Sequence, residues 1–288
     1  MDQLVYLNGS IVAYADARIP IEDRGYQFGD GIYEVIRIYN GRPFTLDRHF
    51  ERLRRSADEI RLPLDIEQLQ ADALSLIERQ GLDEATLYLQ ATRGVAIRNH
   101  AFPSVSTPSV LMLVRPAAPP SDTMRQQGVR CLTVPDDRWA RCSIKSTNLL
   151  SNVLAKQQAV EAGCYEAIYL RDGFMTEGSS ANSWAVFGGE LWTAPKSNYI
   201  LGGITRDVLV ELAREDGLPV REEPVPARRL PQADEFLVSS TTAEVLPVVE
   251  LDGRPVGAGR PGPVWERLHR LLQRRITAEC RPELAEAR

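Results

Sequence analysis

Three prolines, Pro116, Pro119 and Pro120, stand close together within the 288-residue chain. Proline lacks a backbone N–H and has a fixed φ angle, so neither a helix nor a central strand runs easily through such a cluster. We therefore expect a linker at residues 118–122. It would separate a smaller N-terminal α/β domain, residues 1–117, from a larger C-terminal domain, residues 123–288. A chain of this length also corresponds to about two domains.

Helix and strand patterns are mixed along both halves rather than strictly alternating, which favours an α+β fold over a doubly wound parallel sheet. Asn8-Gly9 and Asn40-Gly41 each lie between extended segments and predict tight hairpins. Apolar spacing predicts the remaining elements. Helices are expected at 46–60, 66–79, 147–162, 205–216 and 263–279, and further strands at 86–92, 109–114, 128–134, 165–171, 183–187, 235–239 and 246–251.

The overall composition narrows the class of partner. The formal net charge is −5, with 25% charged residues and no block of like charge, which argues against nucleic acid or an anionic membrane as the partner. The start of the chain has no basic region followed by an apolar run, so we expect a cytoplasmic protein. Cys131, Cys142, Cys164 and Cys280 match no Cys-x-x-Cys pattern, so reduced structural thiols and no metal site are expected. Small metabolites remain as ligands.

Lysine is rare in this chain. Of the 34 Lys and Arg residues, only Lys145, Lys156 and Lys196 are lysines. Arginine stays protonated, whereas a desolvated lysine amine can lose its proton and condense with a carbonyl, so each lysine is a candidate Schiff-base former. Lys145 lies between a short extended segment and a helical pattern, a junction where side chains enter clefts. Lys156 and Lys196 are interpreted as surface charges.

Further candidate residues lie in polar clusters. Arg98 and His100, two positions apart in an irregular segment, can converge on one carboxylate. Gly202-Gly203-Ile204-Thr205 opens a helix, where backbone N–H groups form an anion site. Two more clusters are Thr176-Glu177-Gly178-Ser179-Ser180-Ala181-Asn182 and Ser239-Ser240-Thr241-Thr242. Ordinary alternatives remain: a polar loop, an N-cap, a capping box region and a polar turn. Arg52 has the alternative of a solvated helix charge, and His49 is interpreted as a structural residue.

Six of these motifs occur in order and together resemble the fold-type IV pyridoxal-phosphate aminotransferases, most closely their D-amino-acid transaminases. The resemblance extends from the first hairpin to about residue 275. The motifs, in chain order, are Arg24-Gly-Tyr-Gln-Phe-Gly-Asp-Gly-Ile-Tyr33-Glu, Arg93-Gly-x-x-x-Arg98-x-His100, Ile144-Lys145-Ser, Thr176-Glu177-Gly-Ser-Ser, Gly203-Ile-Thr205-Arg-Asp and Ser239-Ser-Thr-Thr.

The resemblance implies a role for each matching residue. Lys145, in the C-terminal domain, would carry pyridoxal 5′-phosphate as a Schiff base and shuttle the substrate proton. Glu177 would keep the pyridine nitrogen protonated, and Tyr33 would bond the phenolic oxygen. The remaining cofactor-binding positions would be Arg52, Gly203, Ile204, Thr205 and Thr241 at the phosphate, Ser179, Ser180, Asn182 and Ser240 as supporting residues, and Leu201 packed near the cofactor ring.

Substrate and assembly also follow from the resemblance. Arg98 and His100 would reach the active site of a partner subunit and, with Tyr33, trap the substrate α-carboxylate, which implies a homodimer. The expected activity is transfer of the amino group of D-alanine or other D-amino acids to 2-oxoglutarate or other 2-oxo acids. Alternatives are a branched-chain L-aminotransferase or an (R)-amine transaminase, an aminodeoxychorismate lyase, and a non-enzymatic ligand-binding protein.

Overall fold

The computed structural model describes residues 3–281 and divides into two compact units. The first unit comprises the described residues of Met1–Ala118, Ile144–Asn148 and Ala278–Arg288, and the second comprises Pro119–Ser143 and Leu149–Thr277. The division near the prolines falls between Ala118 and Pro119. A short helix, α4, begins at Asp122, at the end of the range expected as a linker.

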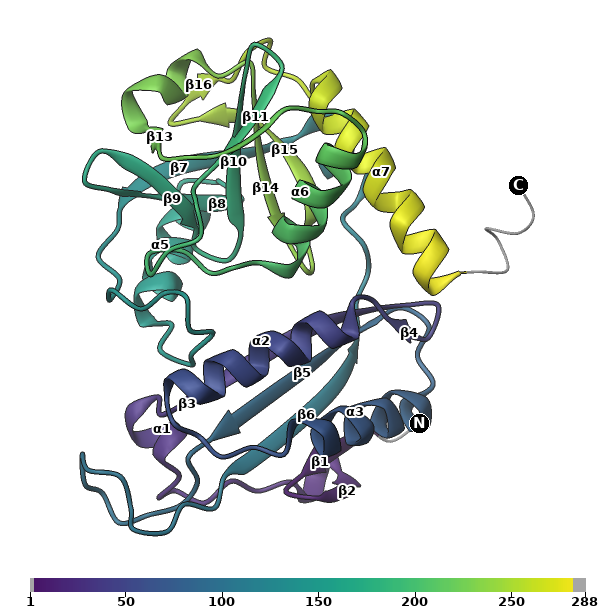
Figure 1. Ribbon diagram of the computed structural model, residues 1–288, viewed down its shortest axis with the longest axis vertical. Coiled ribbons are helices and arrows are strands. Elements are labelled where there is room, and N and C mark those ends of the chain that lie inside the picture. The colour runs from purple at the N-terminus through teal and green to yellow at the C-terminus, as the bar shows by residue number, and fades with distance from the viewer. Residues whose placement is uncertain (1–2, 282–288) are drawn as a thin grey trace. The chain divides into compact units, whose positions relative to one another are not determined.

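The first unit is built on a six-stranded antiparallel sheet in the order β2-β1-β6-β5-β3-β4. Helices α2 and α3 pack together against this sheet (Figure 1). The bounds are β1 Leu4–Leu7, β2 Ser10–Ala13, a 3-10 turn at Tyr14–Asp16, α1 Arg24–Phe28, β3 Gly31–Tyr39, β4 Arg42–Pro43, α2 Leu46–Glu59, α3 Ile66–Gln80, β5 Ala85–Thr92 and β6 Ser109–Pro116.

Local sequence explains most of these elements. Asn8 and Gly9 both have positive φ, at 50° and 88°, and Asn40 and Gly41 do the same at 52° and 71°, so both expected hairpins are confirmed. The apolar stripe of α2, which includes Phe50, Leu53 and Ala57, is buried against the sheet. The structure adds α1, a short helix at the start of the glycine-rich motif Arg24–Glu34, where no helix was predicted.

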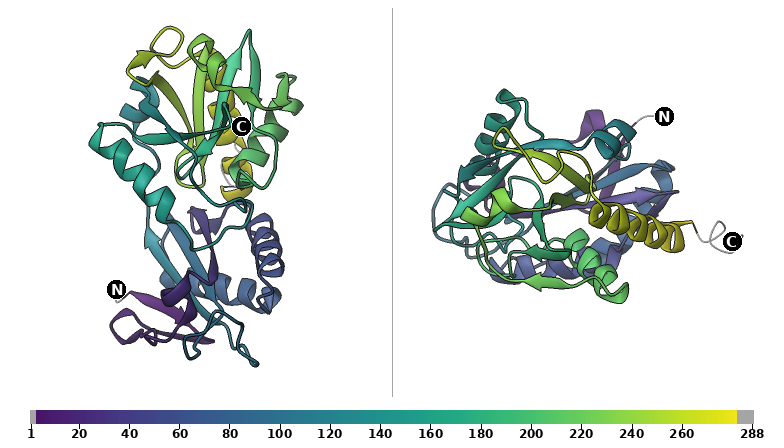
Figure 2. Two further views of the ribbon diagram at one scale, coloured as in Figure 1. Left: turned by 90° about the vertical axis from the view of Figure 1, so that its left-hand side faces the viewer. Right: turned by 90° about the horizontal axis from the view of Figure 1, so that it is seen from above.

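The second unit contains a curled ten-stranded mixed sheet in the order β12-β11-β10-β14-β15-β7-β8-β9-β13, with β16 paired to β15. Helix α5 contacts β7 and β8, and α6 contacts β14 (Figure 1 and Figure 2). The bounds are α4 Asp122–Gln127, β7 Val129–Pro135, α5 Leu150–Glu161, β8 Glu166–Arg171, β9 Phe174–Gly178, β10 Asn182–Phe187, β11 Glu190–Thr193, α6 Ile204–Glu215, β12 Val220–Glu222, β13 Val225–Pro226, a 3-10 helix at Ala227–Gln232, β14 Glu235–Ser240, β15 Glu244–Leu251, β16 Arg254–Pro255 and α7 Pro263–Cys280.

The α+β fold class is therefore confirmed. The first sheet is wholly antiparallel, whereas the second also has parallel pairs, β7 with β8 and with β15, and β11 with β12. Strands of two to five residues, such as β9, β13 and β16, were missed because so few residues show no clear alternation. No helix in the described part of the chain combines the length and the apolar character needed to cross a membrane.

The placement of Lys145 differs from the expectation. Residues 144–148 were assigned to the C-terminal domain, but they cluster with the first unit. The reason is backbone pairing: Tyr33 N donates to the carbonyl of Lys145 at 2.9 Å, and Thr147 N donates to the carbonyl of Gly31 at 3.0 Å. Strand β4 pairs only with the far end of β3, at Ile38 and Tyr39. Residues 144–148 therefore provide hydrogen-bond partners for the backbone at the start of β3, at Gly31 and Tyr33.

Candidate active site

Lys145 is held by its backbone on both sides. Its N–H donates to Ser56 Oγ on α2 at 3.3 Å, and its carbonyl accepts from Tyr33. Ile144 is buried in the core of the first unit, and Ser146 forms a bridge with Ile32 of β3. The chain on each side of Lys145 is therefore anchored, while Lys145 itself is half-buried. Such anchoring directs a long flexible side chain along a defined path.

The Lys145 side chain lies over an aromatic ring. Its Nζ atom is 4.2 Å from the ring centre of Tyr33, a cation–π distance, and Tyr33 lies 5.8 Å from the ring of Tyr88 on β5. Burial, with a smaller contribution from Tyr33, raises the pKa of Tyr88 to about 12. The structure therefore brings together Lys145 and Tyr33, two residues whose numbers are more than a hundred apart.

Arg52 is buried beside the same segment, with 4% of its surface exposed, so the alternative of a solvated helix charge is wrong. Its guanidinium binds Glu34 of β3 at two points, Nε to Oε1 at 2.7 Å and Nη2 to Oε2 at 2.8 Å. His49 Nδ1 lies 2.8 Å from Glu34 Oε2, which confirms its interpretation as a structural residue. Burial raises the pKa of Glu34, but Arg52 and His49 outweigh burial and hold that pKa far below its usual range.

Arg98 and His100 lie on an exposed loop, and both contact one ring. The guanidinium carbon of Arg98 is 4.7 Å from the centre of the Phe28 ring, and the His100 ring centre is 5.4 Å from it. Phe28 ends α1, and the guanidinium carbon of Arg24 also lies 4.8 Å from the centre of its ring. Phe28 was not singled out from the sequence, where its only signal is its place in the glycine-rich motif.

The base of this loop is tied down by buried charges. Arg93 binds Asp30 through Nε at 2.9 Å and through Nη2 at 3.0 Å, and Arg24 binds the same carboxylate at 2.8 Å. Arg24 Nη1 also donates to the carbonyl of Asn99 at 2.5 Å. The arginines of the glycine-rich motif and of the loop motif thus share one acid, so the two motifs form one structural feature.

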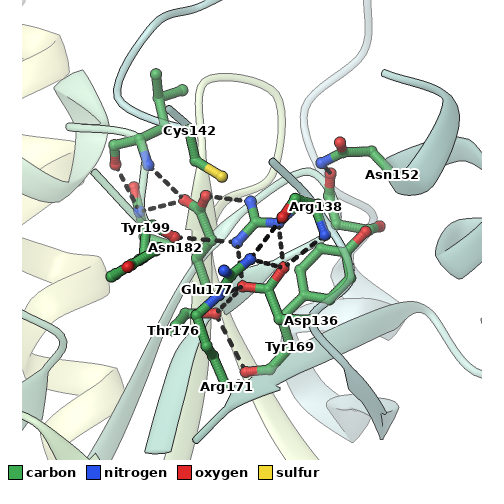
Figure 3. A network of polar contacts seen from close by, with 12 residues as sticks. Asp136, Arg138, Cys142, Asn152, Tyr169, Arg171, Thr176, Glu177, Asn182 and Tyr199 are labelled. Carbon is green, nitrogen blue, oxygen red and sulfur yellow. Dashed lines mark hydrogen bonds and ion pairs between the residues drawn. The ribbon is translucent and has the colours of Figure 1, made fainter. Parts of the chain in front are cut away.

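Glu177 belongs to a network of polar contacts in the second unit (Figure 3). It lies on β9, with only 5% of its surface exposed. Its Oε2 atom accepts from Asn182 Nδ2 at 3.1 Å and from the backbone N–H of Leu201 at 3.0 Å. Burial raises the pKa of Glu177 to about 7, although Arg138 acts in the opposite direction. This is a carboxylate whose protonation is balanced near neutral pH.

Arg138 is the principal site residue that sequence reasoning missed. Its Nη1 atom donates to Glu177 Oε1 at 2.5 Å, while Nε and Nη2 both donate to Asp136, each at 2.9 Å (Figure 3). Arg171 and the hydroxyl of Thr176 also bind Asp136. The only signal in the sequence is a polar cluster, Asp136-Asp137-Arg138, directly after β7, and such clusters are common at strand ends.

The start of α6 lies close to the Glu177 cluster. Gly203 is the N-cap and supplies no side chain, so the first N–H groups of the helix, at Ile204 and Thr205, have no side-chain cap there. A Cβ atom on Gly203 would meet Asn182 Oδ1 at 2.0 Å. Asn182 also donates to the carbonyl of Leu201 at 3.0 Å, so Leu201, Gly203 and Asn182 are packed tightly around Glu177.

The serines of the candidate set have partners within the protein. Ser179 Oγ donates to Glu166 Oε1, and Ser180 Oγ donates to Glu166 Oε2 at 2.5 Å. Ser240 Oγ accepts from the N–H of Ala243 at 3.1 Å, and Thr241 is half-buried in the same turn. The three serine hydroxyls therefore hold their loops in place through hydrogen bonds within the protein.

Two further expectations concern metals and thiols. The described residues contain no group of three or more His, Cys, Asp and Glu side chains arranged to hold a metal ion. Cys142 is buried, and burial raises the pKa of its thiol to about 11, so it is neutral at physiological pH. Cys142 is thus a reduced, buried thiol, as expected from the sequence.

Residues 31–251 match the family model described as amino-transferase class IV. D-alanine aminotransferase of Staphylococcus aureus (strain COL) is 45% identical over 275 residues, covering 94% of this chain and 97% of the relative. D-alanine aminotransferase of Bacillus licheniformis is 44% identical over 277 residues, covering 96% and 98%.

Solved structures show the same fold at lower identity. The branched-chain amino acid aminotransferase of Escherichia coli has a TM-score of 0.86 and 28% sequence identity, covering 97% of this chain and 95% of the other. A T.th. branched-chain amino acid aminotransferase with pyridoxamine 5′-phosphate has a TM-score of 0.89 and 28% identity, covering 98% and 96%. The likeness to D-alanine aminotransferases is therefore the stronger one in sequence, while the fold is shared more widely.

Proposed function

Since the chain belongs to the class IV aminotransferases, which depend on pyridoxal phosphate, we propose that it is a D-amino-acid transaminase. It transfers the amino group of D-alanine or other D-amino acids to 2-oxoglutarate or other 2-oxo acids, in two half-reactions of a ping-pong cycle. The observation that carries this proposal is the 45% identity to a D-alanine aminotransferase along 94% of the chain. Identity to the two branched-chain enzymes of the same fold is 28%.

The residues present suit pyridoxal phosphate. The cofactor combines a phosphate, a carbonyl that reacts with amines and a basic pyridine nitrogen, and when bound it withdraws electrons from the carbon that bears the amino group. The described residues offer matching chemistry: an uncapped helix start at Gly203, the amine of Lys145 and the buried carboxylate of Glu177. The missing Cβ of Gly203 leaves room for the side chain of Asn182, which bonds to Glu177.

Lys145 is proposed as the catalytic residue. Its amine would hold the cofactor covalently and, when free, would move the proton at the substrate α-carbon. The ring centre of Tyr33 lies 4.2 Å from Lys145 Nζ. We propose that the Tyr33 hydroxyl donates a hydrogen bond to the phenolic oxygen of the cofactor. The anchored backbone of Lys145 supports this role, because proton transfer requires a defined position of the amine.

Glu177 is proposed to hold the pyridine nitrogen in its protonated state. For the phosphate, we propose the start of α6, with Gly203, Ile204 and Thr205, together with Thr241 and Arg52. Arg52 also binds Glu34, so its orientation is set by an internal carboxylate. Asn182 and Leu201 support Glu177 by direct hydrogen bonds, while Ser179, Ser180 and Ser240 support the surrounding loops.

Arg98 and His100 are proposed to bind the α-carboxylate of the substrate together with Tyr33. A guanidinium offers two parallel donors to a carboxylate, and fixing that group determines which hydrogen of the α-carbon faces Lys145. We propose that the loop acts in a partner subunit of a homodimer. Exposure of both side chains on an anchored loop supports this arrangement.

Complementation between inactive variants tests the shared site. Lys145→Ala and Arg98→Ala subunits, each inactive alone, are mixed, unfolded and refolded together. If Arg98 acts in the partner, hybrid dimers contain one intact site, and about a quarter of the original activity returns. No recovery, with hybrid dimers confirmed by mass spectrometry, would place Arg98 and Lys145 of one site on the same subunit.

The decisive test of the activity is a spectroscopic half-reaction. Cofactor-loaded protein is mixed with D-alanine, L-alanine, L-leucine or (R)-1-phenylethylamine without an acceptor, and the visible band of the lysine-bound cofactor is followed. Loss of the band with D-alanine alone is expected. Bleaching by L-leucine or by the amine would instead favour the branched-chain or (R)-amine alternative. Pyruvate released from aminodeoxychorismate without any acceptor would favour the lyase. A Lys145→Ala variant should show no such band.

A further inference from the structure

Arg138 lies between two buried carboxylates of the second unit. It binds Asp136 at two points, each at 2.9 Å, and Glu177 at one point, at 2.5 Å (Figure 3). The side chains of Asp136, Arg138 and Glu177 are 0%, 5% and 6% exposed. Arg138 Nη2 also donates to the carbonyl of Tyr199 at 3.1 Å. All three nitrogens of the guanidinium therefore have a hydrogen-bond partner.

Asp136 has more cationic partners than Glu177. Besides Arg138, it binds Arg171, and it accepts from the hydroxyl of Thr176 at 3.1 Å. Burial raises the pKa of Asp136, but Arg138 and Arg171 outweigh burial and lower it to about 2, so Asp136 is ionised at neutral pH. A two-point bond to an ionised carboxylate fixes the plane of a guanidinium. Arg138 therefore presents Nη1 to Glu177 in one orientation.

Arg138 is the cation that binds Glu177 directly. The groups that face it are Arg138, the amide of Asn182 and the N–H of Leu201, with Asp136 and the neutral thiol of Cys142 nearby. Asp136 disfavours a negative charge on Glu177, as burial does. Arg138 is the one charged group of this set that favours it.

We propose that Arg138, oriented by Asp136, is a positioning residue that favours the ionised form of the Glu177 carboxylate and turns it toward the pyridine nitrogen of the cofactor. This inference rests on the proposed function, which assigns that nitrogen to Glu177. Without Arg138, a buried Glu177 would take up a proton at neutral pH and lose its ability to stabilise a protonated nitrogen. Removal of Arg138 should then slow the proton-transfer step and leave the affinity for the amino acid nearly unchanged.

The first test uses the cofactor-free protein. The side-chain carbon of Glu177 is followed by carbon-13 NMR across a pH titration, with Glu177→Gln used to assign its signal. In Arg138→Gln and Arg138→Met the midpoint should move upward by about one pH unit or more, whereas Arg138→Lys should stay near the original value. Arg171→Met is the matched control, because Arg171 binds Asp136 but makes no direct bond to Glu177.

The second test uses the cofactor-loaded protein. Arg138→Gln should lower kcat for D-alanine by about a hundredfold with KM changed less than about threefold, and Arg138→Lys should recover most of kcat. Glutamine keeps an N–H donor, so Arg138→Gln can be used in both tests if Arg138→Met does not fold.

The two tests separate the possible failures. An unchanged Glu177 titration in folded Arg138→Gln, or a titration and kcat equal to those of Arg171→Met, would overturn the role of Arg138. If the wild-type protein fails to react with D-alanine while the titration shifts as expected, the link from Arg138 to Glu177 stands and the proposed activity falls.

Discussion

Arg52 of α2 binds Glu34 of β3 through two hydrogen bonds, of 2.7 and 2.8 Å, with both side chains almost fully buried. This pair joins helix α2 to strand β3 of the sheet, and His49 bonds to the same acid. A residue proposed to bind a phosphate is therefore also part of the folding core. Its two roles can be separated by experiment.

Arg52→Met should destabilise the cofactor-free protein by about 3–5 kcal/mol, because it leaves the buried Glu34 carboxylate without its main cation. Arg55→Met, on the exposed face of the same helix, should change the free energy of unfolding by less than about 0.5 kcal/mol. In the double variant Arg52→Met/Glu34→Gln, much of the loss should be recovered. Urea unfolding measures all three, and equal losses for Arg52→Met and Arg55→Met would contradict the structural role.

Glu177 should make the stability of the cofactor-free protein depend on pH. Its folded-state pKa of about 7 lies above the ordinary value of 4.5, so the folded protein holds the proton more tightly than the unfolded chain does. Stability from this group is therefore complete below about pH 4.5 and is lost as the pH rises through 7, by about 3 kcal/mol at most. Glu177→Gln should match the wild type near pH 5 and exceed it near pH 8, as measured by urea unfolding. Parallel pH profiles would refute the expectation.

Gly203→Ala should disrupt the start of α6. The new Cβ would meet Asn182 Oδ1 at 2.0 Å and push aside the amide that supports Glu177. We expect the cofactor dissociation constant, measured by fluorescence titration, to rise about tenfold or more, with a loss of about 1–3 kcal/mol in stability. Gly202→Ala is the control, since a Cβ there has no neighbour closer than 3.9 Å. If Gly203→Ala and Gly202→Ala had similar cofactor dissociation constants and similar stability, close packing would not explain the glycine at position 203.

Phe28→Leu should weaken recognition of the substrate carboxylate, because Arg98 and His100 both contact this ring. The Arg98 contact is a cation–π contact, worth about 0.5–1 kcal/mol at an exposed site, so its loss alone should raise the KM for D-alanine about two- to fivefold. The half-reaction with D-alaninamide, which has no carboxylate, should change little. Tyr26→Leu, an exposed residue of the same short helix, should leave both substrates unaffected. An equal effect on the amide and the acid would rule out this role.

Several parts of the fold could be predicted because their causes are local. The Asn-Gly pairs at 8–9 and 40–41 take the positive φ angles that a tight hairpin requires. The apolar residues of α2 recur at helical spacing along the sequence, so the buried face of that helix could be predicted. The site residues Lys145 and Glu177 could be named because their motifs occur in order along the chain. The structure brings Lys145 to Tyr33, and it surrounds Glu177 with hydrogen-bond donors.

Other features depend on which distant segments meet, and only the tertiary structure decided them. Local patterns assigned residues 144–148 to the second domain, but the free end of β3 pairs with them in the first unit. Arg138 and Glu177 are 39 positions apart, and Arg52 and Glu34 are 18 apart. The sequence by itself determined the periodicity, the turns and the supply of reactive groups, since these arise from neighbouring residues. The choice of charge partners was decided by packing, because a buried charge binds whichever opposite charge the fold brings within reach.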